Sequence, residues 1–165
     1  MTGISNGDRV QNDLPQPVEV FISYNHKDEL LREKLETHLS LLRRQGVIAA
    51  WHDRRITAGR EWAGAIDEHL DRAAVILLLV SADFLASDYC YDREMARALE
   101  RHDAGEARVI PVILQPVEWH EAPFARLQVL PRDGKPITKW SPRAEGYKSV
   151  AEGIRKAVEE IQAHP

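Results

Sequence analysis

The apolar run "AAVILLLVS", residues 73–81, decides the fold of this chain. Eight apolar residues precede Ser81 without the polar alternation that a half-buried strand shows. A run of this kind is typical of a strand that is buried on both faces of a parallel sheet. It is much shorter than the roughly 20 apolar residues that a membrane-spanning helix needs. The run therefore predicts the central strand of an α/β protein.

Strands and helices alternate on either side of this run. Segments rich in β-branched and aromatic residues predict four further strands: "VEVFISY" (18–24), "VIAAWHD" (47–53), "RVIPVIL" (108–114) and "KPITKW" (135–140). Apolar residues at helical spacing separate them, and a last helix has Val150, Ile154, Val158 and Ile161 on one face. This alternation predicts a doubly wound sheet with right-handed crossovers. Pro111 lacks a backbone N–H, so a bulge or local break is expected in the strand at 108–114.

Length, charge and cysteine content narrow the class of protein. The 165 residues suit one domain with a sizeable core, which we expect at residues 18–162. The net charge of -4, from 22 basic and 26 acidic residues, argues against nucleic acid or an anionic membrane as the main partner. A single cysteine excludes an internal disulfide and fits a reducing cytosol. Residues 1–17 predict a flexible leader without signal-peptide features, and residues 163–165 a short tail. We therefore expect a cytoplasmic protein.

Several kinds of chemistry lack their sequence motif. The chain contains neither G-x-G-x-x-G nor G-x-x-x-x-G-K-[ST], which excludes the two common phosphate-binding loops. Its seven histidines form no H-x-x-x-H or H-x-H pair, and a lone Cys90 cannot build a thiolate zinc site, so no metal is expected. Ser81 stands where a phosphoacceptor aspartate would close the third strand. Cys90 as a nucleophile at a helix N-terminus remains an alternative, although most free cysteines are inert core residues.

Glu94 is the candidate reactive group that remains. Ligands of doubly wound sheets bind beyond the carboxyl ends of the strands, and "SADFLASDYCYDRE" (81–94) follows the central strand. Glu94 therefore lies at the edge where chemistry would occur. The alternative is a solvated helix charge that pairs with Arg97, three residues further on.

Three segments in order resemble the signature motifs of TIR domains. "VFISYNHKD" resembles the first box, and "WHDRRITAGREW" resembles the second box with the BB loop of the family. "VILLLVSADFLASDYCYDREM" resembles the third strand, the S-x-x-[FY]-x-x-S connection and the helix that carries the family's glutamate. The resemblance runs from about residue 18 to 161 and is greatest to bacterial members. Together with the alternating pattern, it predicts a flavodoxin-like five-stranded parallel sheet in the order 2-1-3-4-5, with helices on both faces.

The resemblance implies one of two functions. Many bacterial and plant TIR domains cleave NAD+ at the nicotinamide–ribose bond and release nicotinamide with ADP-ribose or cyclic ADP-ribose. Glu94 falls on the position of their catalytic glutamate, with NAD+ as substrate and no other cofactor. Animal receptor and adaptor TIR domains serve instead as self-associating scaffolds. Either function is consistent with the motifs.

The resemblance also suggests residues that bind the substrate. Phe21, Ser23 and Tyr24 match positions that line the nicotinamide–ribose pocket of the family. The local alternative places Phe21 in the core, with Ser23 and Tyr24 bonded to the turn.

The second box adds Asp53 and Arg55 to this expected substrate site. Asp53 ends a strand and either meets the ligand or holds a loop amide. Arg55, with the nearby Arg54 and Arg60, is expected to meet the pyrophosphate or a neighbouring subunit, although most charged loop residues are simply solvated.

Cys90 is a departure from the enzymatic pattern. Enzymatic relatives often carry an aromatic residue four positions before the glutamate, one helical turn back, where it can stack on the base. The chain has Cys90 there, between Tyr89 and Tyr91. Either tyrosine is a candidate to replace the missing aromatic.

The resemblance further implies self-association. TIR assembly through the BB loop and neighbouring helices completes the pocket, so a homo-oligomer or filament is expected on activation. A sensor domain or separate sensor protein is the expected trigger. Bacterial antiphage signalling and interference with a host both remain open as the biological role.

Overall fold

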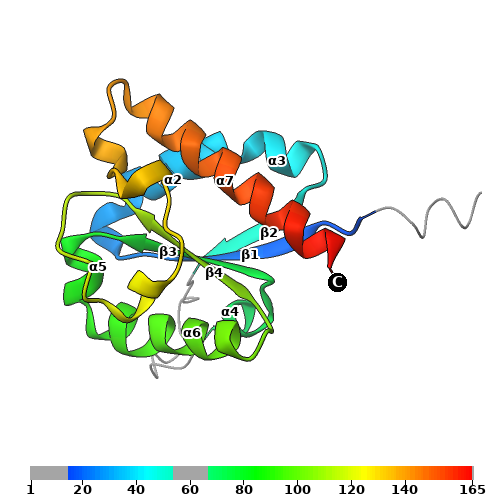
Figure 1. The fold of residues 1–165 in the computed structure, drawn as a ribbon, viewed down its shortest axis with the longest axis horizontal. Helices are drawn as coiled ribbons and strands as arrows, with labels where there is room; N and C mark the ends of the chain where they lie inside the picture. Colours follow the sequence, from blue (N-terminus) through cyan, green and yellow to red (C-terminus); the bar gives the residue numbers. More distant parts are fainter. Residues whose placement is uncertain (1–14, 54–66, 165) are drawn as a thin grey trace, which may run out of the picture.

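The computed structural model describes residues 15–53 and 67–164, and within them the chain forms a single parallel sheet (Figure 1). Its strands are β1 (Val18–Ser23), β2 (Ile48–Asp53), β3 (Val75–Val80) and β4 (Arg108–Ile113), in the order β2-β1-β3-β4. All neighbouring strands are parallel. The predicted fold class and strand order are therefore confirmed for these four strands. The leader at 1–17 and the tail at 163–165 stay predictions.

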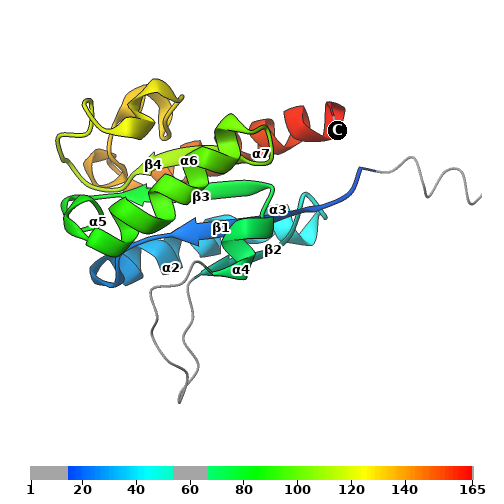
Figure 2. The same cartoon turned by 90° about the horizontal axis from the view of Figure 1, so that it is seen from below.

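Helices cover both faces of the sheet (Figures 1 and 2). One face carries α2 (Glu29–His38), α3 (Ser40–Arg44) and α7 (Arg143–Ala163), and the other carries α4 (Glu68–Arg72), α5 (Ala82–Ala86) and α6 (Ala96–Asp103). Short 3-10 turns occur at η1 (His26–Asp28), η3 (Pro123–Arg126), η4 (Arg132–Gly134) and η5 (Ile137–Lys139), and η2 (Tyr89–Met95) is a π-helix. Among the described helices, none is both long and apolar enough to cross a bilayer.

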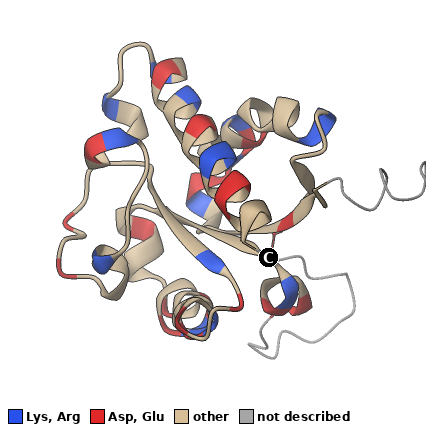
Figure 3. Ribbon diagram, turned by 45° about the vertical axis from the view of Figure 1, so that its right-hand side comes forward, with Lys and Arg blue, Asp and Glu red and all other residues tan. Residues whose placement is uncertain are grey.

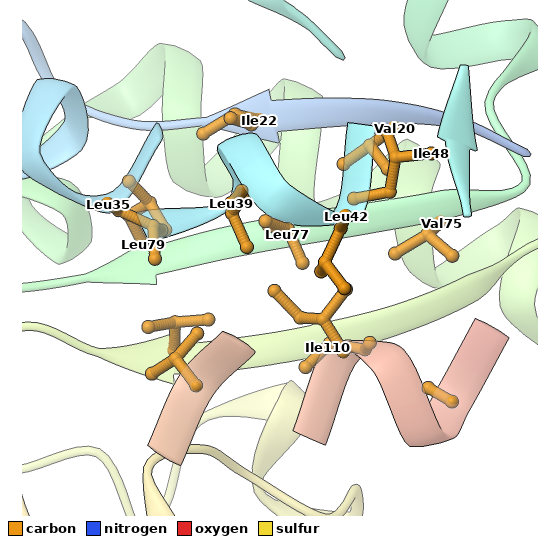
Figure 4. Close-up of a cluster of buried hydrophobic side chains, with 14 of the residues drawn as sticks. Val20, Ile22, Leu35, Leu39, Leu42, Ile48, Val75, Leu77, Leu79 and Ile110 are labelled. Carbon is orange, nitrogen blue, oxygen red and sulfur yellow. The ribbon is translucent and has the colours of Figure 1, made fainter. Parts of the chain in front are cut away.

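β3 is the centre of the core, as its apolar run predicts. All six of its side chains are buried, and they alternate between two hydrophobic clusters. Leu77 and Leu79 face Leu35 and Leu39 of the α2 layer (Figure 4), whereas Ile76 and its neighbours face the α5 and α6 layer. The carboxyl end of β3 is therefore held in place from both sides of the sheet.

The prediction of a fifth strand at residues 135–140 is wrong. Residues 135–140 contain η5 in place of a strand, because their amides bond locally: Trp140 N–H donates to Ile137 O at 3.1 Å and Lys139 N–H to Pro136 O at 2.9 Å. Pro136 itself offers no N–H to a ladder. Among the described residues, one isolated parallel bridge joins Val112 of β4 to Leu130. The backbone at Leu130 thus lies at the outer edge of β4, where the fifth strand was expected.

The break expected at Pro111 is also wrong, since β4 pairs with β3 in unbroken register from Arg108 to Ile113. The N–H groups of Arg108 and Leu114 donate to β3-side carbonyls, whereas Ile113 N–H donates outward to Leu130 O at 2.8 Å. Residues alternate in this way along a parallel strand, so the nitrogen of Pro111 faces the outer edge. The missing N–H therefore removes no bond to β3.

His102 covers the same outer edge. Its Nδ1 accepts the Val109 N–H at 3.1 Å. Burial, with Arg126 nearby, lowers the pKa of His102, although Asp103 acts in the opposite direction. Burial and Lys34 likewise lower the pKa of His38. Both imidazoles therefore lose their proton more easily than a free histidine does, and His102 needs the neutral form in order to accept the strand amide.

Acidification below about pH 6.5 is expected to destabilise the chain through these two histidines. A histidine whose folded pKa lies below its unfolded pKa binds more protons in the unfolded state. Stability is therefore lost as the pH falls below the unfolded pKa and through the folded pKa. The melting temperature should be lower at about pH 5 than at about pH 7.5, and His102→Gln should reduce the difference. Thermal melts of both proteins across this range check the prediction. An unchanged pH dependence in His102→Gln would show that His102 does not contribute.

Charges of both signs are interspersed over the surface. In the view of Figure 3, acidic and basic residues alternate along the helices. Some of them pair, as Arg108 does with Glu160 at 2.8 Å and Lys148 with Glu152 at 3.9 Å. Exposed pairs of this kind contribute little to stability.

Candidate active site

Glu94 lies in a π-helix at the carboxyl edge of the sheet. After β3, Ser81 caps α5 by accepting the Phe84 N–H at 3.1 Å, and η2 follows before α6 begins. The expected ordinary helix is therefore replaced here by wider turns, which are rare and often occur at functional sites. Cys90, Glu94 and Met95 are the buried residues of this segment. Its geometry turns the Glu94 side chain into the protein.

The Glu94 carboxylate is fully buried and is bonded to β1. Its exposed fraction is 0%, and Ser23 Oγ donates a hydrogen bond of 2.8 Å to its Oε1. Ser23 ends β1 and is itself 1% exposed. Arg97 lies elsewhere, with its Nε 2.8 Å from Asp71 Oδ1 of α4. The interpretation of Glu94 as a solvated charge paired with Arg97 is therefore wrong.

Burial of an ionisable carboxyl group has no obvious benefit for stability. Transfer of a carboxylate out of water is costly, so a buried carboxylate needs polar partners such as the Ser23 hydroxyl. Buried ionisable groups at a strand edge are accordingly enriched at functional sites. Glu94 is both buried and close to the carboxyl edge of the sheet, which makes it the central residue of the candidate site.

The other predicted site residues have different environments. Phe21 is 0% exposed and packs with Ile76 and Phe84 in the core, which is the local alternative considered for it. Tyr24 is half-buried and lies against Arg32, whose Cζ is 4.8 Å from the centre of the Tyr24 ring. Arg55, with Arg54 and Arg60, lies outside the described residues.

Arg32 joins Tyr24 and Asp53, and the sequence motifs did not point to it. Its Nη1 is 3.4 Å from Asp53 Oδ2 at the end of β2 and 2.7 Å from Glu36 Oε1. Burial opposes the charge of Arg32, yet the hydrogen bond to Glu36 and the neighbouring carboxylates keep its pKa raised. A signal was available, because Arg32 shares the helical face of Leu35 and Leu39, where a charge needs a partner.

Cys90 occupies the position one turn before Glu94 as a buried packing residue. It is 1% exposed, and its Sγ lies 3.5 Å from the backbone oxygen of Tyr24. Tyr89 and Tyr91 are half-buried on either side. Cys90 therefore fills the position that enzymatic relatives use for stacking, and the replacement of the missing aromatic by Tyr89 or Tyr91 stays a prediction. The buried thiol argues against the nucleophile alternative.

A second buried carboxylate, Asp28, lies at the same edge and was also missed. It is 2% exposed. Ser81 Oγ donates a short hydrogen bond to its Oδ2, and Gln115 Nε2 donates to its Oδ1 at 2.9 Å. Asp28 follows β1, Ser81 follows β3 and Gln115 follows β4. One carboxylate thus links the connections after three neighbouring strands.

Within the described residues, the candidate site contains no metal-binding cluster, and the cavity beside β4 lies apart from it. Among the residues that the structure describes, no three side chains of metal-binding type gather in one place. A cavity of about 770 Å³ lies between β4 and α7 and is lined by residues such as Val109, Leu130 and Lys156. Glu94 and Ser23 do not line it. The candidate site is therefore defined by the buried side chains at the ends of β1 and β3.

A family model and a curated relative match most of the chain. The model of the TIR domain matches residues 20–158. A protein of Sinorhizobium fredii (strain NBRC 101917 / NGR234), named uncharacterized protein y4lF, is 59% identical over 138 residues. That match covers 84% of this chain and 43% of the relative, so the chain spans less than half of the relative's length.

One of two similar solved structures shares the fold of this chain at low sequence identity. The TIR domain of the Toll-related receptor TRR-2 from Hydra magnipapillata is 21% identical, with a TM-score of 0.53 over 82% of this chain and 97% of that one. The TIR domains of the activated Roq1 resistosome, which directly recognizes the pathogen effector XopQ, are 20% identical with a TM-score of 0.46. That match covers 82% of this chain and 84% of that chain.

Proposed function

This chain belongs to the TIR domain family, and on that premise we propose that it cleaves NAD+ at the nicotinamide–ribose bond. Glu94 is the proposed catalytic carboxylate. The observation that carries the proposal is its position: fully buried at the carboxyl edge of the sheet, with the Ser23 hydroxyl on Oε1 at 2.8 Å. Glu94 also falls on the glutamate position of the family's motif.

A single carboxylate is sufficient for this reaction. Cleavage at C1′ of the ribose develops oxocarbenium character, as in glycoside hydrolysis. Nicotinamide leaves as a neutral molecule from a pyridinium, so no general acid has to protonate it. One anion beside the ribose orients the hydroxyls and stabilises the developing positive charge. Ser23 supports this role by fixing the orientation of the Glu94 carboxylate.

The full burial of Glu94 supports regulation by assembly. NAD+ reaches a side chain that is 0% exposed only after neighbouring segments move. We therefore include self-association in the proposal, as the event that opens and completes the site. The partner is another copy of the domain, and the trigger is a sensor domain or a separate sensor protein.

Activity is expected to rise more steeply than linearly with protein concentration. Association converts a closed site into an open one, so the rate per chain should increase together with the mean mass. Light scattering across a concentration series, with nicotinamide release measured on the same samples, checks this. A monomer at every concentration with full activity would contradict activation by assembly.

A non-catalytic scaffold is the second candidate. It is favoured by Cys90, a buried residue that stands in place of the usual aromatic. A scaffold would assemble without releasing nicotinamide, so the two functions differ in one observable. We add a cytoplasmic role in bacterial antiphage signalling to the proposal. Linear or cyclic ADP-ribose would form according to whether water or adenine reaches C1′ first.

A further inference from the structure

We propose that Asp28 is a positioning residue that sets the place of Glu94 by linking the loops at the carboxyl edge. The inference rests on the proposed function for its catalytic consequence. Asp28 contacts neither Glu94 nor Ser23 directly in its hydrogen bonds, which go to Ser81 and Gln115. Its effect on Glu94 is therefore transmitted through the segments that these residues begin.

The chemistry of Asp28 is unusual for a residue of purely structural value. The carboxylate is 2% exposed, and among the described residues no Lys or Arg lies within ion-pair distance of it. It occupies the N-cap position of α2 without a side-chain hydrogen bond to the helix. The helix dipole and two neutral donors compensate for only part of the cost of burying this charge. We therefore look for a role of this carboxylate in addition to stability.

The hydrogen bonds show what that role is. Ser81 donates to Asp28 and at the same time caps α5 by accepting the Phe84 N–H. α5 leads directly into η2, which carries Glu94. Gln115 adds the connection after β4. Asp28 thus fixes where the segment that carries Glu94 starts.

The far end of the same segment is bonded to β1. Ser23 donates to Glu94, and Cys90 Sγ contacts the backbone oxygen of Tyr24 at 3.5 Å. The β1 connection is therefore attached to the catalytic segment at its start, through Asp28, and near its end, through Ser23. Loss of the first attachment removes the bond that fixes the start of the segment that carries Glu94. A displacement of about 1 Å at a catalytic group can cost on the order of a hundredfold in rate.

The test compares Asp28→Ala and Asp28→Asn with a control at the opposite edge. In Asp28→Asn, the amide oxygen still accepts from Ser81, and Gln115 can rotate to offer its own oxygen to the new amide. The control is Arg101→Met, which removes a buried guanidinium that binds the backbone oxygens of Leu70 and Ala73 at 2.7 and 2.8 Å. These carbonyls precede β3. Arg101→Met is therefore destabilising without touching the carboxyl edge.

With clustered protein and NAD+, Asp28→Ala is expected to lower kcat at least about tenfold with KM within about threefold of wild type. Asp28→Asn and Arg101→Met should both keep kcat within about threefold, although Arg101→Met melts earlier than wild type. A kcat loss in Arg101→Met as large as that in Asp28→Ala, at an equal loss of melting temperature, would overturn the proposal. An equal loss in Asp28→Asn would overturn it too.

Hydrogen exchange separates this inference from the proposed function. Amides of residues 81–95 should exchange faster in Asp28→Ala than in wild type, and by a larger factor than in Arg101→Met. If clustered wild type releases no nicotinamide, the proposed function fails and exchange alone decides on Asp28. Unchanged exchange across residues 89–95 in Asp28→Ala would then overturn the positioning role.

Discussion

Replacement of Glu94 with glutamine is expected to lower nicotinamide release at least about a hundredfold. Glutamine has the same shape but no charge to stabilise the oxocarbenium ion. Its side-chain oxygen can still accept the Ser23 hydroxyl, so the fold should be retained. The melting temperature should therefore stay near that of wild type while the rate falls.

Glu100→Gln is the matched control for this variant. Glu100 lies on α6, in the same helical region, and its side chain is 70% exposed. The same chemical change at this exposed position should leave the rate unaltered. If Glu94→Gln turned over NAD+ as fast as wild type, Glu94 would not be the catalytic carboxylate.

Leu77→Ala is expected to have the largest effect on stability. Leu77 is 0% exposed in the middle of β3, between Ile22 of β1 and Ile110 of β4. Truncation of a fully buried leucine leaves a cavity and costs about 2–5 kcal/mol. For a chain of this size, that corresponds to a fall in melting temperature of roughly 5–15 °C. Denaturant and thermal melts measure both quantities.

Leu41→Ala tests whether this effect comes from burial. Leu41 lies on α3 and is 56% exposed. The same substitution there should change the free energy of unfolding by no more than about 0.5 kcal/mol. Equal effects of the two substitutions would contradict the central position of β3.

A strand was predictable from the sequence where its side chains alone determine its place in the sheet. β3 has only apolar residues to bury on both faces, so its place at the centre follows from its composition. The fifth strand was not predictable, because "KPITKW" has strand-like residues but its amides find local carbonyls after Pro136. The effect of Pro111 depends on which way its nitrogen faces, and a single strand read alone does not contain that information.

Glu94 was predictable from the sequence as a site residue, whereas the contacts of the residues around it were not. Its position after the central strand and the family's motif both point to it. Phe21 resembles a pocket residue in the motif, yet it packs in the core because its side of β1 faces α5. Asp28 and Arg32 form their contacts with residues from distant segments, such as Gln115 and Asp53. Pairings across such sequence separations arise only from the tertiary fold.

The most direct test of the central claim is nicotinamide release by artificially clustered wild-type protein. The clustered protein is incubated with NAD+, and the products are separated by chromatography. The account predicts that nicotinamide accumulates with time together with ADP-ribose or its cyclic form, at a rate well above that of the dispersed protein. Clustered protein that assembles and leaves NAD+ intact would contradict the account and establish the scaffold function instead.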